Sequence, residues 1–342
     1  MDMNSKLTTL NQEANFARYI PTQKKGHYES YFLRANHPTK PIAFWIRYTI
    51  FSPHKKPEKA IGELWAIVFD GETGVHAAVK DELPISKSLF DKNRFHVKIG
   101  DAHLDSEKLQ GSASSGSNTI RWDLSYAGND RPLFLFPMNL YDRKLPKAKA
   151  LVGVPLALFN GRITVNDREV AIKDWVGSQN HNWGSQHTDH YAWGQIAGFD
   201  NHAESFFELA TARIRIGPFW TPFMTLMVLR HRGREFCLNS IRQSLKAEGS
   251  FEYFQWKFSS EDETVAVDGT ISAAREDFIG LKYYNPPGGI KHCLNTKIAS
   301  CRMMVRLKKE ETGERTEVLE TLSRAAFEIL TDKTDHGVKM YT

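Results

Sequence analysis

Short runs of β-branched and aromatic residues, separated by glycine and polar turns, most constrain what this chain can fold into. Representative runs are AFWIRYTIF (43–51), ELWAIVFD (63–70), SFFELATARIRI (205–216) and FEYFQWKF (251–258). Runs of this kind at a spacing of about ten residues predict an all-β protein, built as an antiparallel barrel or a sandwich. Helical periodicity is weak, and only residues 10–20 and 323–330 are expected to form short helices.

The chain length favours two folding units. A chain of 342 residues is too long for one small core and suits two ordinary domains, or one large β domain. The basic, proline-containing stretch RKLPKAKALVGVP (143–155) has the composition of a segment that crosses between units. We therefore expect an N-terminal β domain over residues 1–175 and a C-terminal β domain over residues 176–342.

Charge and cysteine content exclude several classes of protein. Lys and Arg number 45 and Asp and Glu number 40, so the net charge of +5 is too small for a dedicated nucleic-acid binder. Three cysteines, Cys237, Cys293 and Cys301, form neither a disulfide framework nor a C-x-x-C zinc motif. The polar start, Met1–Arg18, lacks the apolar region of a secretion signal, and no long apolar run follows. A cytoplasmic protein is expected, and no feature indicates its oligomeric state.

One segment, residues 173–195 (KDWVGSQNHNWGSQHTDHYAWGQ), concentrates polar and aromatic side chains. It holds three of the 13 histidines and three of the eight tryptophans in 23 residues. Three interpretations compete: a loop that satisfies its own backbone, a metal site made by His181, His187 and His190, and the polar-aromatic wall of a ligand cavity. We favour the cavity wall and expect no metal. The predicted ligand-binding residues are Gln179, Asn182, Trp183, His187, Tyr191 and Trp193, together with Phe206 on the strand that follows.

The next predicted strand supplies an acid. In SFFELATARI, alternation places Phe206, Glu208 and Ala210 on one face of the strand. Apolar neighbours raise the pKa of a carboxyl, so Glu208 can stay protonated near neutral pH and donate a proton to an alkene. The alternative is an ion pair between Glu208 and Arg213 or Arg215. Elsewhere, a bridge from Glu29 to Arg34 or to Arg47 is expected, because an isolated buried charge is costly.

Several tracts in order resemble the carotenoid 1,2-hydratase and tocopherol cyclase-like proteins, with their AttH-type relatives. The tracts are HYESYFLRANHP (27–38), FWIRYTIFSP (44–53), ELWAIVFD (63–70), GSQNHNWG (177–184), HYAWGQ (190–195) and FIGLKYYNPPGGIKHCLN (278–295). The resemblance implies two lipocalin-like antiparallel β-barrel domains that hold an apolar ligand. His181 and Trp183 match the His-x-Trp pair of the hydratases. Phe206 and Glu208 stand where that family has Tyr-x-Asp, so the acid is kept and the tyrosine is replaced.

The resemblance also implies cofactor-independent chemistry on isoprenoids or polyketides: hydration of a carbon–carbon double bond, or cyclisation. We therefore expect a hydratase (a hydro-lyase) or cyclase of carotenoid or isoprenoid biosynthesis that takes a hydrophobic small molecule, with contact to a membrane surface for substrate pickup. Glu208 would protonate the alkene, and His181 would orient or deprotonate the attacking water or hydroxyl. The aromatic faces of Trp183 and Trp193 would stabilise the developing cation. The alternative is a non-catalytic lipid carrier on the same fold.

Overall fold

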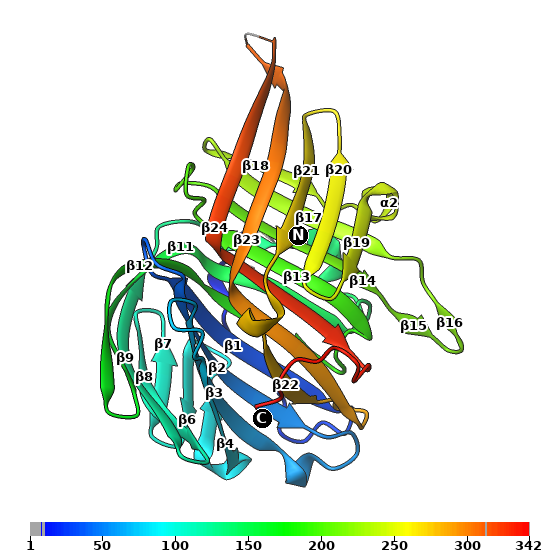
Figure 1. The fold of residues 1–342 in the computed structure, drawn as a ribbon. Helices are drawn as coiled ribbons and strands as arrows, with labels where there is room; N and C mark the ends of the chain where they lie inside the picture. The colour runs from blue at the N-terminus through cyan, green and yellow to red at the C-terminus, as the bar shows by residue number, and fades with distance from the viewer. Residues whose placement is uncertain (1–7, 9–10, 312, 342) are drawn as a thin grey trace.

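The computed structural model describes residue 8, residues 11–311 and residues 313–341. These residues form two large antiparallel sheets that pack against each other, with few helices (Figure 1). The all-β prediction is confirmed: the first sheet is a nearly closed barrel, and the second is a half-barrel. Four short 3-10 helices lie in connections, at Pro57–Lys59, Ile85–Lys87, Met138–Leu140 and Arg275–Asp277.

The first sheet has the order β4-β3-β2-β1-β12-β11-β9-β8-β7-β6-β5, and β10 pairs with β11 beside that path. Its first six strands are β1 (His27–Asn36), β2 (Ile42–Ser52), β3 (Ile61–Asp70), β4 (Ala77–Pro84), β5 (Ser88–Phe90) and β6 (His96–Ile99). The other six are β7 (Ala102–Asp105), β8 (Lys108–Ser115), β9 (Asn118–Ala127), β10 (Leu133–Phe134), β11 (Ala148–Val165) and β12 (Arg168–Gly184). The sheet curls so that β4 packs against β8 and β9 and encloses the barrel core.

The second sheet has the order β18-β17-β14-β13-β24-β23-β21-β20-β19, and β22 pairs with β23. Its first strands are β13 (His190–Ala197), β14 (Phe206–Arg213), β17 (Met224–His231), β18 (Arg234–Leu238) and β19 (Glu248–Glu252). The later ones are β20 (Gln255–Glu261), β21 (Val265–Ser272), β22 (Ile279–Tyr284), β23 (Ile290–Glu310) and β24 (Gly313–Thr331). A separate hairpin of β15 (Arg215–Ile216) and β16 (Phe219–Trp220) and the short helix α2 (Ile241–Lys246) lie at its edge (Figure 1).

Burial follows the position of each strand. In β9, Ile120, Trp122, Leu124 and Tyr126 point into the barrel and alternate with exposed residues, as expected for a strand with one wet face. In contrast, β1, β2 and β3 are buried almost throughout. One face of these strands packs on the barrel core and the other on the second sheet, so their sequences read as continuous apolar runs.

Two expectations about segments are wrong. The division expected at residue 175 falls inside β12, because residues 176–184 pair with β1 in one continuous ladder, and the chain crosses between the sheets at 185–189. Residues 323–330, expected to form a helix, are part of β24. They are buried strand residues because β13 pairs with one edge of β24 and β23 with the other, so that tertiary pairing overrides the helical preference of Ala, Glu and Leu. Within the described residues, no helix is long and apolar enough to cross a bilayer.

Arg34 joins the two sheets at their interface. Its side chain is fully buried on β1, and its guanidinium donates to the carbonyl oxygen of Gln195 on β13 at 2.9 Å and to that of Arg324 on β24 at 3.2 Å. It also donates to the side chains of Asn36 at 2.8 Å and Gln195 at 3.2 Å. The positive charge is thus solvated by fixed dipoles from both sheets.

We expect Arg34→Met to lower the free energy of unfolding by about 3 kcal/mol, because it leaves buried carbonyl oxygens without donors. Urea titration of the two proteins measures the difference. Arg302→Met is the matched control: Arg302 is 72% exposed and pairs with Glu320 at the surface, so its loss should change stability by less than about 0.5 kcal/mol. Equal effects from the two substitutions would show that Arg34 does not hold the sheets together.

Candidate functional site

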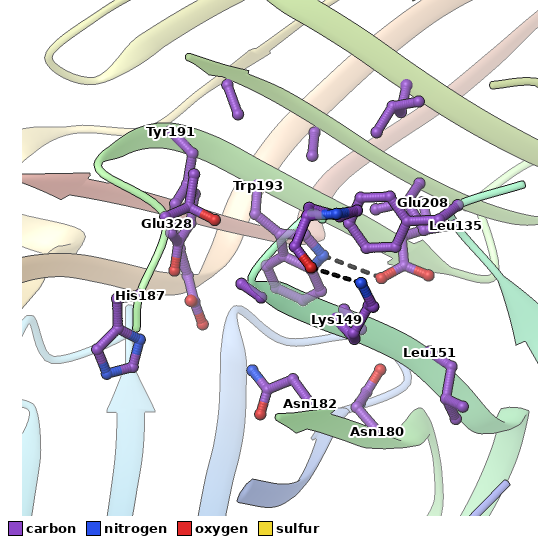
Figure 2. Close-up of a pocket in the computed structure, with 18 of the residues that line it drawn as sticks. Leu135, Lys149, Leu151, Asn180, Asn182, His187, Tyr191, Trp193, Glu208 and Glu328 are labelled. Atoms are coloured by element: carbon purple, nitrogen blue, oxygen red, sulfur yellow. Dashed lines mark hydrogen bonds between the residues drawn. The ribbon is translucent and has the colours of Figure 1, made fainter. Parts of the chain in front are cut away.

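A cavity of about 320 Å³ lies between the two sheets. Its wall is formed by β1, β2, β11 and β12 of the first sheet, by β13, β14, β17, β22 and β24 of the second, and by the connection over residues 135–146 (Figure 2). Apolar side chains dominate the lining, with a few polar groups among them. Such a chamber suits an apolar guest that is oriented by a small number of hydrogen bonds.

Glu208 lies in this wall with one oxygen held and the other free. Strand alternation points Glu208, Ala210 and Ala212 at the cavity, while Phe207 and Leu209 enter the core of the second sheet. The indole Nε1 of Trp193 donates to Oε1 of Glu208 at 3.0 Å, and Oε2 is buried with no hydrogen-bond partner among the described residues (Figure 2).

The environment of Glu208 favours the neutral form of its carboxyl. Burial raises the pKa of Glu208 to about 7, and the hydrogen bond from Trp193 opposes part of that rise. The alternative ion pair is wrong: the guanidinium of Arg213 stacks over Trp220 at 4.5 Å, and the short β15 places the exposed Arg215 beyond the end of β14. A carboxyl group with a pKa near 7 is about half protonated at neutral pH, and with one oxygen that has no partner among the described residues on an apolar cavity it can act as a proton donor.

Aromatic residues surround this acid. Trp193 makes an edge contact with Phe32 of the first sheet, with 5.8 Å between ring centroids, and Tyr191 lies two residues before it on the same face of β13. His187 also lines the cavity and stacks on Tyr28 at 4.0 Å. Burial lowers the pKa of His187 to about 3, so the ring is neutral at physiological pH. Asn182 completes this set, with a buried Oδ1 that has no partner among the described residues.

His181 borders the cavity, but both of its ring nitrogens are already bonded. Nδ1 contacts the carbonyl oxygen of Ala14 at 2.7 Å, so it carries a proton, and Nε2 bonds to Glu29 at 2.8 Å. Glu29 also accepts from the backbone of Arg18 and bonds to His27. Although burial alone would raise it, the hydrogen bonds from His181 and His27 lower the pKa of Glu29 to about 2. The expected bridges from Glu29 to Arg34 or Arg47 are therefore wrong.

Three other predicted ligand-binding residues lie away from the cavity. Gln179 and Trp183 share the face of β12 that carries His181, where Gln179 bonds to Asn15 and Trp183 packs near Tyr141. Phe206 is packed in an apolar cluster between the sheets. The error for Gln179 and Trp183 has one physical cause. Alternation along β12 turns odd-numbered residues toward the N-terminal segment, so Asn180 and Asn182 face the second sheet instead.

The three histidines considered as metal ligands have separate partners. His181 bonds to Glu29, His187 stacks on Tyr28, and Nδ1 of His190 contacts the carbonyl oxygen of Leu330 at 3.0 Å. Among the described residues, a different group, His202, Glu204 and His231, brings possible ligand atoms within 4.8 Å of one another. The ring of His231 is engaged on both sides, by Ser205 and by Glu317, which makes this group a hydrogen-bonded structural cluster.

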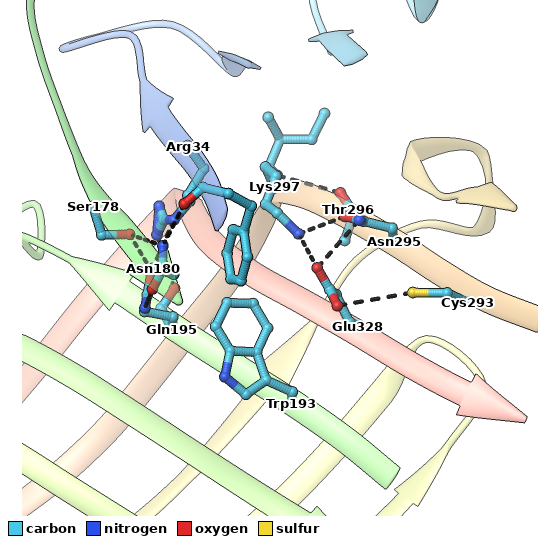
Figure 3. A network of polar contacts seen from close by, with 12 residues as sticks. Arg34, Ser178, Asn180, Trp193, Gln195, Cys293, Asn295, Thr296, Lys297 and Glu328 are labelled. Atoms are coloured by element: carbon cyan, nitrogen blue, oxygen red, sulfur yellow. Dashed lines mark hydrogen bonds and ion pairs between the residues drawn. The ribbon is translucent and has the colours of Figure 1, made fainter. Parts of the chain in front are cut away.

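The sequence did not identify a second buried carboxyl in the cavity wall, Glu328. It lies opposite Trp193 on the neighbouring strand, so that Trp193 separates it from Glu208 (Figure 2). Lys297, fully buried, donates to Oε1 of Glu328 at 2.7 Å, and Asn295 donates to the same oxygen at 3.2 Å (Figure 3). The sequence signal for Glu328 is a glutamate inside the apolar run AAFEIL. This signal can be recognised when the run is assigned to a strand and not to a helix.

Lys149 is a further lining residue that the sequence did not reveal. Its ammonium group donates to the carbonyl oxygens of Arg143 and Pro146, and only 5% of the residue is exposed. Burial lowers the pKa of Lys149 to about 8. The cavity therefore holds a cation beside the connection between the sheets, in addition to its two carboxyl groups.

Comparison with known proteins identifies the fold of this chain but not its activity. No family model matches the chain. Two curated proteins of Mycobacterium tuberculosis strains, the uncharacterised MT0513 and Rv0493c, are each 25% identical over 189 residues, which is 54% of this chain and 55% of theirs. The chain thus spans about half the length of the curated relatives it matches.

Solved structures align over nearly the whole chain. A protein of Nitrosomonas europaea assigned as AttH gives a TM-score of 0.57 with 10% identity, covering 92% of this chain and 99% of its own. Kievitone hydratase of Nectria haematococca gives 0.56 with 11% identity, covering 90% and 89%. CghA in complex with Sch210972 gives 0.54 with 8% identity, covering 93% and 97%. The resemblance seen in the sequence is confirmed at the level of the fold.

We expect Glu208→Gln to remove a pH-dependent loss of stability. The pKa of Glu208 rises from 4.5 to about 7 on folding, so the folded state binds the extra proton between these values and stability falls as pH rises through that window. At pH values above 7 the free energy of unfolding of the variant should be higher than that of the wild type by roughly 3 kcal/mol. Below pH 4.5 this difference should vanish. Urea titrations at several pH values measure it.

Glu317→Gln provides a control of opposite sign. The hydrogen bond from Arg232 holds the pKa of Glu317 well below its usual value, so its stabilising effect is present at neutral pH and is lost on acidification. This variant should be less stable than the wild type at neutral pH. A Glu208→Gln variant whose stability relative to the wild type does not change with pH would mean that Glu208 is ionised throughout.

Proposed function

We propose that the protein binds an apolar, alkene-containing molecule of isoprenoid or polyketide type between its two sheets and catalyses acid-assisted hydration or cyclisation. The observation that carries the proposal is the carboxyl of Glu208, which has a pKa of about 7 and a free Oε2 on the apolar cavity. Supporting it, the proteins of similar fold include a hydratase, kievitone hydratase. That activity belongs to the neighbour, and here it supports only the class of reaction.

In the proposed reaction, Glu208 Oε2 gives its proton to one carbon of the alkene. The π electrons form the new C–H bond and leave a cationic carbon at the other end. Water, or a hydroxyl group of the same molecule, adds its oxygen to that carbon and then loses a proton. Ionised Glu208 takes that proton, so the acid is regenerated and the reaction balances with water as the only co-reactant, or with none for ring closure.

The aromatic wall has two roles in this scheme. The hydrogen bond from Trp193 fixes Oε1 of Glu208 and leaves Oε2 directed at the guest. The indole face of Trp193 and the ring of Tyr191 stabilise the developing positive charge through their quadrupoles. Oδ1 of Asn182, which has no partner among the described residues, can accept a hydrogen bond from a hydroxyl group on the substrate.

His181 has an indirect role in the proposal. The return of the proton is assigned to Glu208 because both ring nitrogens of His181 are bonded, to Ala14 and to Glu29. His181 then positions β12, and with it Asn180 and Asn182, against the N-terminal segment. The earlier expectation that it deprotonates the nucleophile would require the bond to Glu29 to break.

Glu208→Gln should lower turnover at least about 100-fold, because it keeps the shape of the side chain and the acceptor for Trp193 while removing the acidic proton. The measurement is product formation from acyclic isoprenoid alkenes and prenylated phenols in water enriched in heavy oxygen, followed by mass spectrometry. Hydration incorporates the label, whereas cyclisation gives an isomer without it. Glu320→Gln, at an exposed surface pair, is the control that should keep full turnover.

Two outcomes would contradict the proposal. Turnover by Glu208→Gln close to the wild-type value would remove Glu208 from the chemistry. A lipid that co-purifies with the protein and returns unchanged after incubation, with no product from any alkene, would instead indicate the non-catalytic carrier.

The pH profile should fall as pH rises above about 7, since only protonated Glu208 is active. Because the hydrogen bond from Trp193 lowers the pKa of Glu208, Trp193→Phe should move this fall to higher pH, by up to about one unit. The same profile measured for both proteins tests the assignment. A fall at the same pH in both would mean that another group controls the reaction.

A further inference from the structure

The hairpin of β15 and β16 exposes an unusual set of large apolar side chains. Ile216, Phe219, Trp220 and Phe223 are 58%, 75%, 43% and 38% exposed. The hairpin forms its own two-stranded sheet, turns at Gly217 with a φ of 60°, and projects from the body of the molecule (Figure 1). Three large apolar residues on one projecting element, with Phe223 next to its base, exceed the scattered exposure that is normal for a surface.

The hairpin is an ordered element. The backbones of Ile214 and Thr221 are hydrogen-bonded at 3.0 Å across its base. The guanidinium of Arg213 lies over the rings of Trp220 at 4.5 Å and Phe223 at 4.9 Å. The apolar side chains are therefore presented in a fixed arrangement, with a cation beneath the aromatic rings.

The same apolar surface continues into the cavity between the sheets. Ile214 and Met224, at the base of the hairpin, line the cavity. Ile241 on α2 and Leu145 on the connection also line it, yet they are 58% and 51% exposed, so they mark its mouth. We call the exposed apolar residues around this opening the mouth patch: Leu145, Ile216, Phe219, Trp220, Phe223, Ile241 and Leu245.

Basic residues border the mouth patch. The three segments that form it, residues 142–149, 213–224 and 240–247, contain one acidic residue, Asp142. Their exposed basic residues are Arg143, Lys144, Lys147, Arg215, Arg242 and Lys246. An apolar centre with a cationic border complements a surface that is apolar inside and anionic outside, which is the interface of an anionic bilayer.

We propose that the mouth patch docks on an anionic lipid surface, with the hairpin tip among the headgroups and upper acyl chains and the basic residues on the phosphates. The cavity would then open toward the membrane, which is where an apolar substrate of the proposed function would reside. The purpose of docking rests on the proposed function, whereas the docking surface itself does not depend on that function. A second copy of the chain is a poor occupant, since two copies of this surface would bring their basic borders together.

The test uses the full chain and sedimentation with two vesicle compositions: phosphatidylcholine alone, and phosphatidylcholine mixed with phosphatidylglycerol. The wild type should bind the mixed vesicles more tightly, and added salt should weaken that binding. The double variant Phe219→Ser, Trp220→Ser should bind mixed vesicles at least about tenfold more weakly, because two interfacial apolar anchors are lost. Both side chains are exposed, so the fold should be retained, and circular dichroism checks it.

Matched variants separate the contributions. Leu322→Ser removes an apolar side chain that is 82% exposed on β24, outside the mouth patch, and should bind as the wild type does. Arg242→Glu with Lys246→Glu should weaken binding to mixed vesicles and leave binding to phosphatidylcholine unchanged. Glu208→Gln should bind vesicles normally, so a failure of the proposed chemistry and a failure of docking are distinguishable.

Absence of binding to the mixed vesicles would overturn the proposal. So would an equal loss from Leu322→Ser, which would show that any exposed apolar residue has the same effect. A dimer in sedimentation velocity that Phe219→Ser, Trp220→Ser converts to monomer, with no vesicle binding, would assign the mouth patch to a second copy instead.

Discussion

The site depends on one buried amide, Gln195, which fixes the two sheets relative to each other. Its side-chain oxygen accepts from Ser178 at 2.6 Å and from Arg34 at 3.2 Å, and its nitrogen donates to Asn180 at 2.8 Å (Figure 3). These bonds leave the amide well satisfied and lock β13 of the second sheet onto β1 and β12 of the first. Trp193 and Glu208 follow from that register, because the former is two residues away on β13 and the latter is paired with Gln195 on β14.

Two carboxyl groups, those of Glu328 and Glu208, lie in the cavity wall in different environments. Glu328 has a buried ammonium, Lys297, within 2.7 Å, and Arg47 lies in the same wall. Glu208, two strands away, has an indole N–H and apolar neighbours, so its neutral form is favoured. The same residue type can therefore serve as the partner of a buried ammonium at one end and as a proton donor at the other. Exchanging the apolar neighbours of Glu208 for a cation would abolish the difference that the proposed chemistry requires.

The features that could be predicted from the sequence are those that depend on the local pattern of residues. Alternation in SFFELATARI places Glu208 among apolar residues, and the paired sheets follow from strand-like runs at regular spacing. Partners that come from distant segments could not be predicted. The bond between Glu29 and His181, the pair of Lys297 and Glu328, and the assignment of residues 323–330 to a strand all depend on which strands become neighbours. The side of β12 that faces the cavity could not be predicted either. Adjacent strand residues point to opposite sides, and Gln179 and Trp183 lie on the side that faces away from the cavity.

The rigidity of the junction restricts how a guest can reach Glu208. Opening the two sheets would break the bonds of Gln195 and Arg34 together, and it would expose charge that is solvated only by fixed dipoles. At the edge of the cavity formed by the connection over residues 135–146, the base of the β15–β16 hairpin and α2, the lining residues Leu145 and Ile241 are 51% and 58% exposed. Entry through this edge leaves the junction intact. The strands that carry Glu208 and Trp193 thus hold these side chains in place, and the short elements beside them provide the route by which a ligand enters.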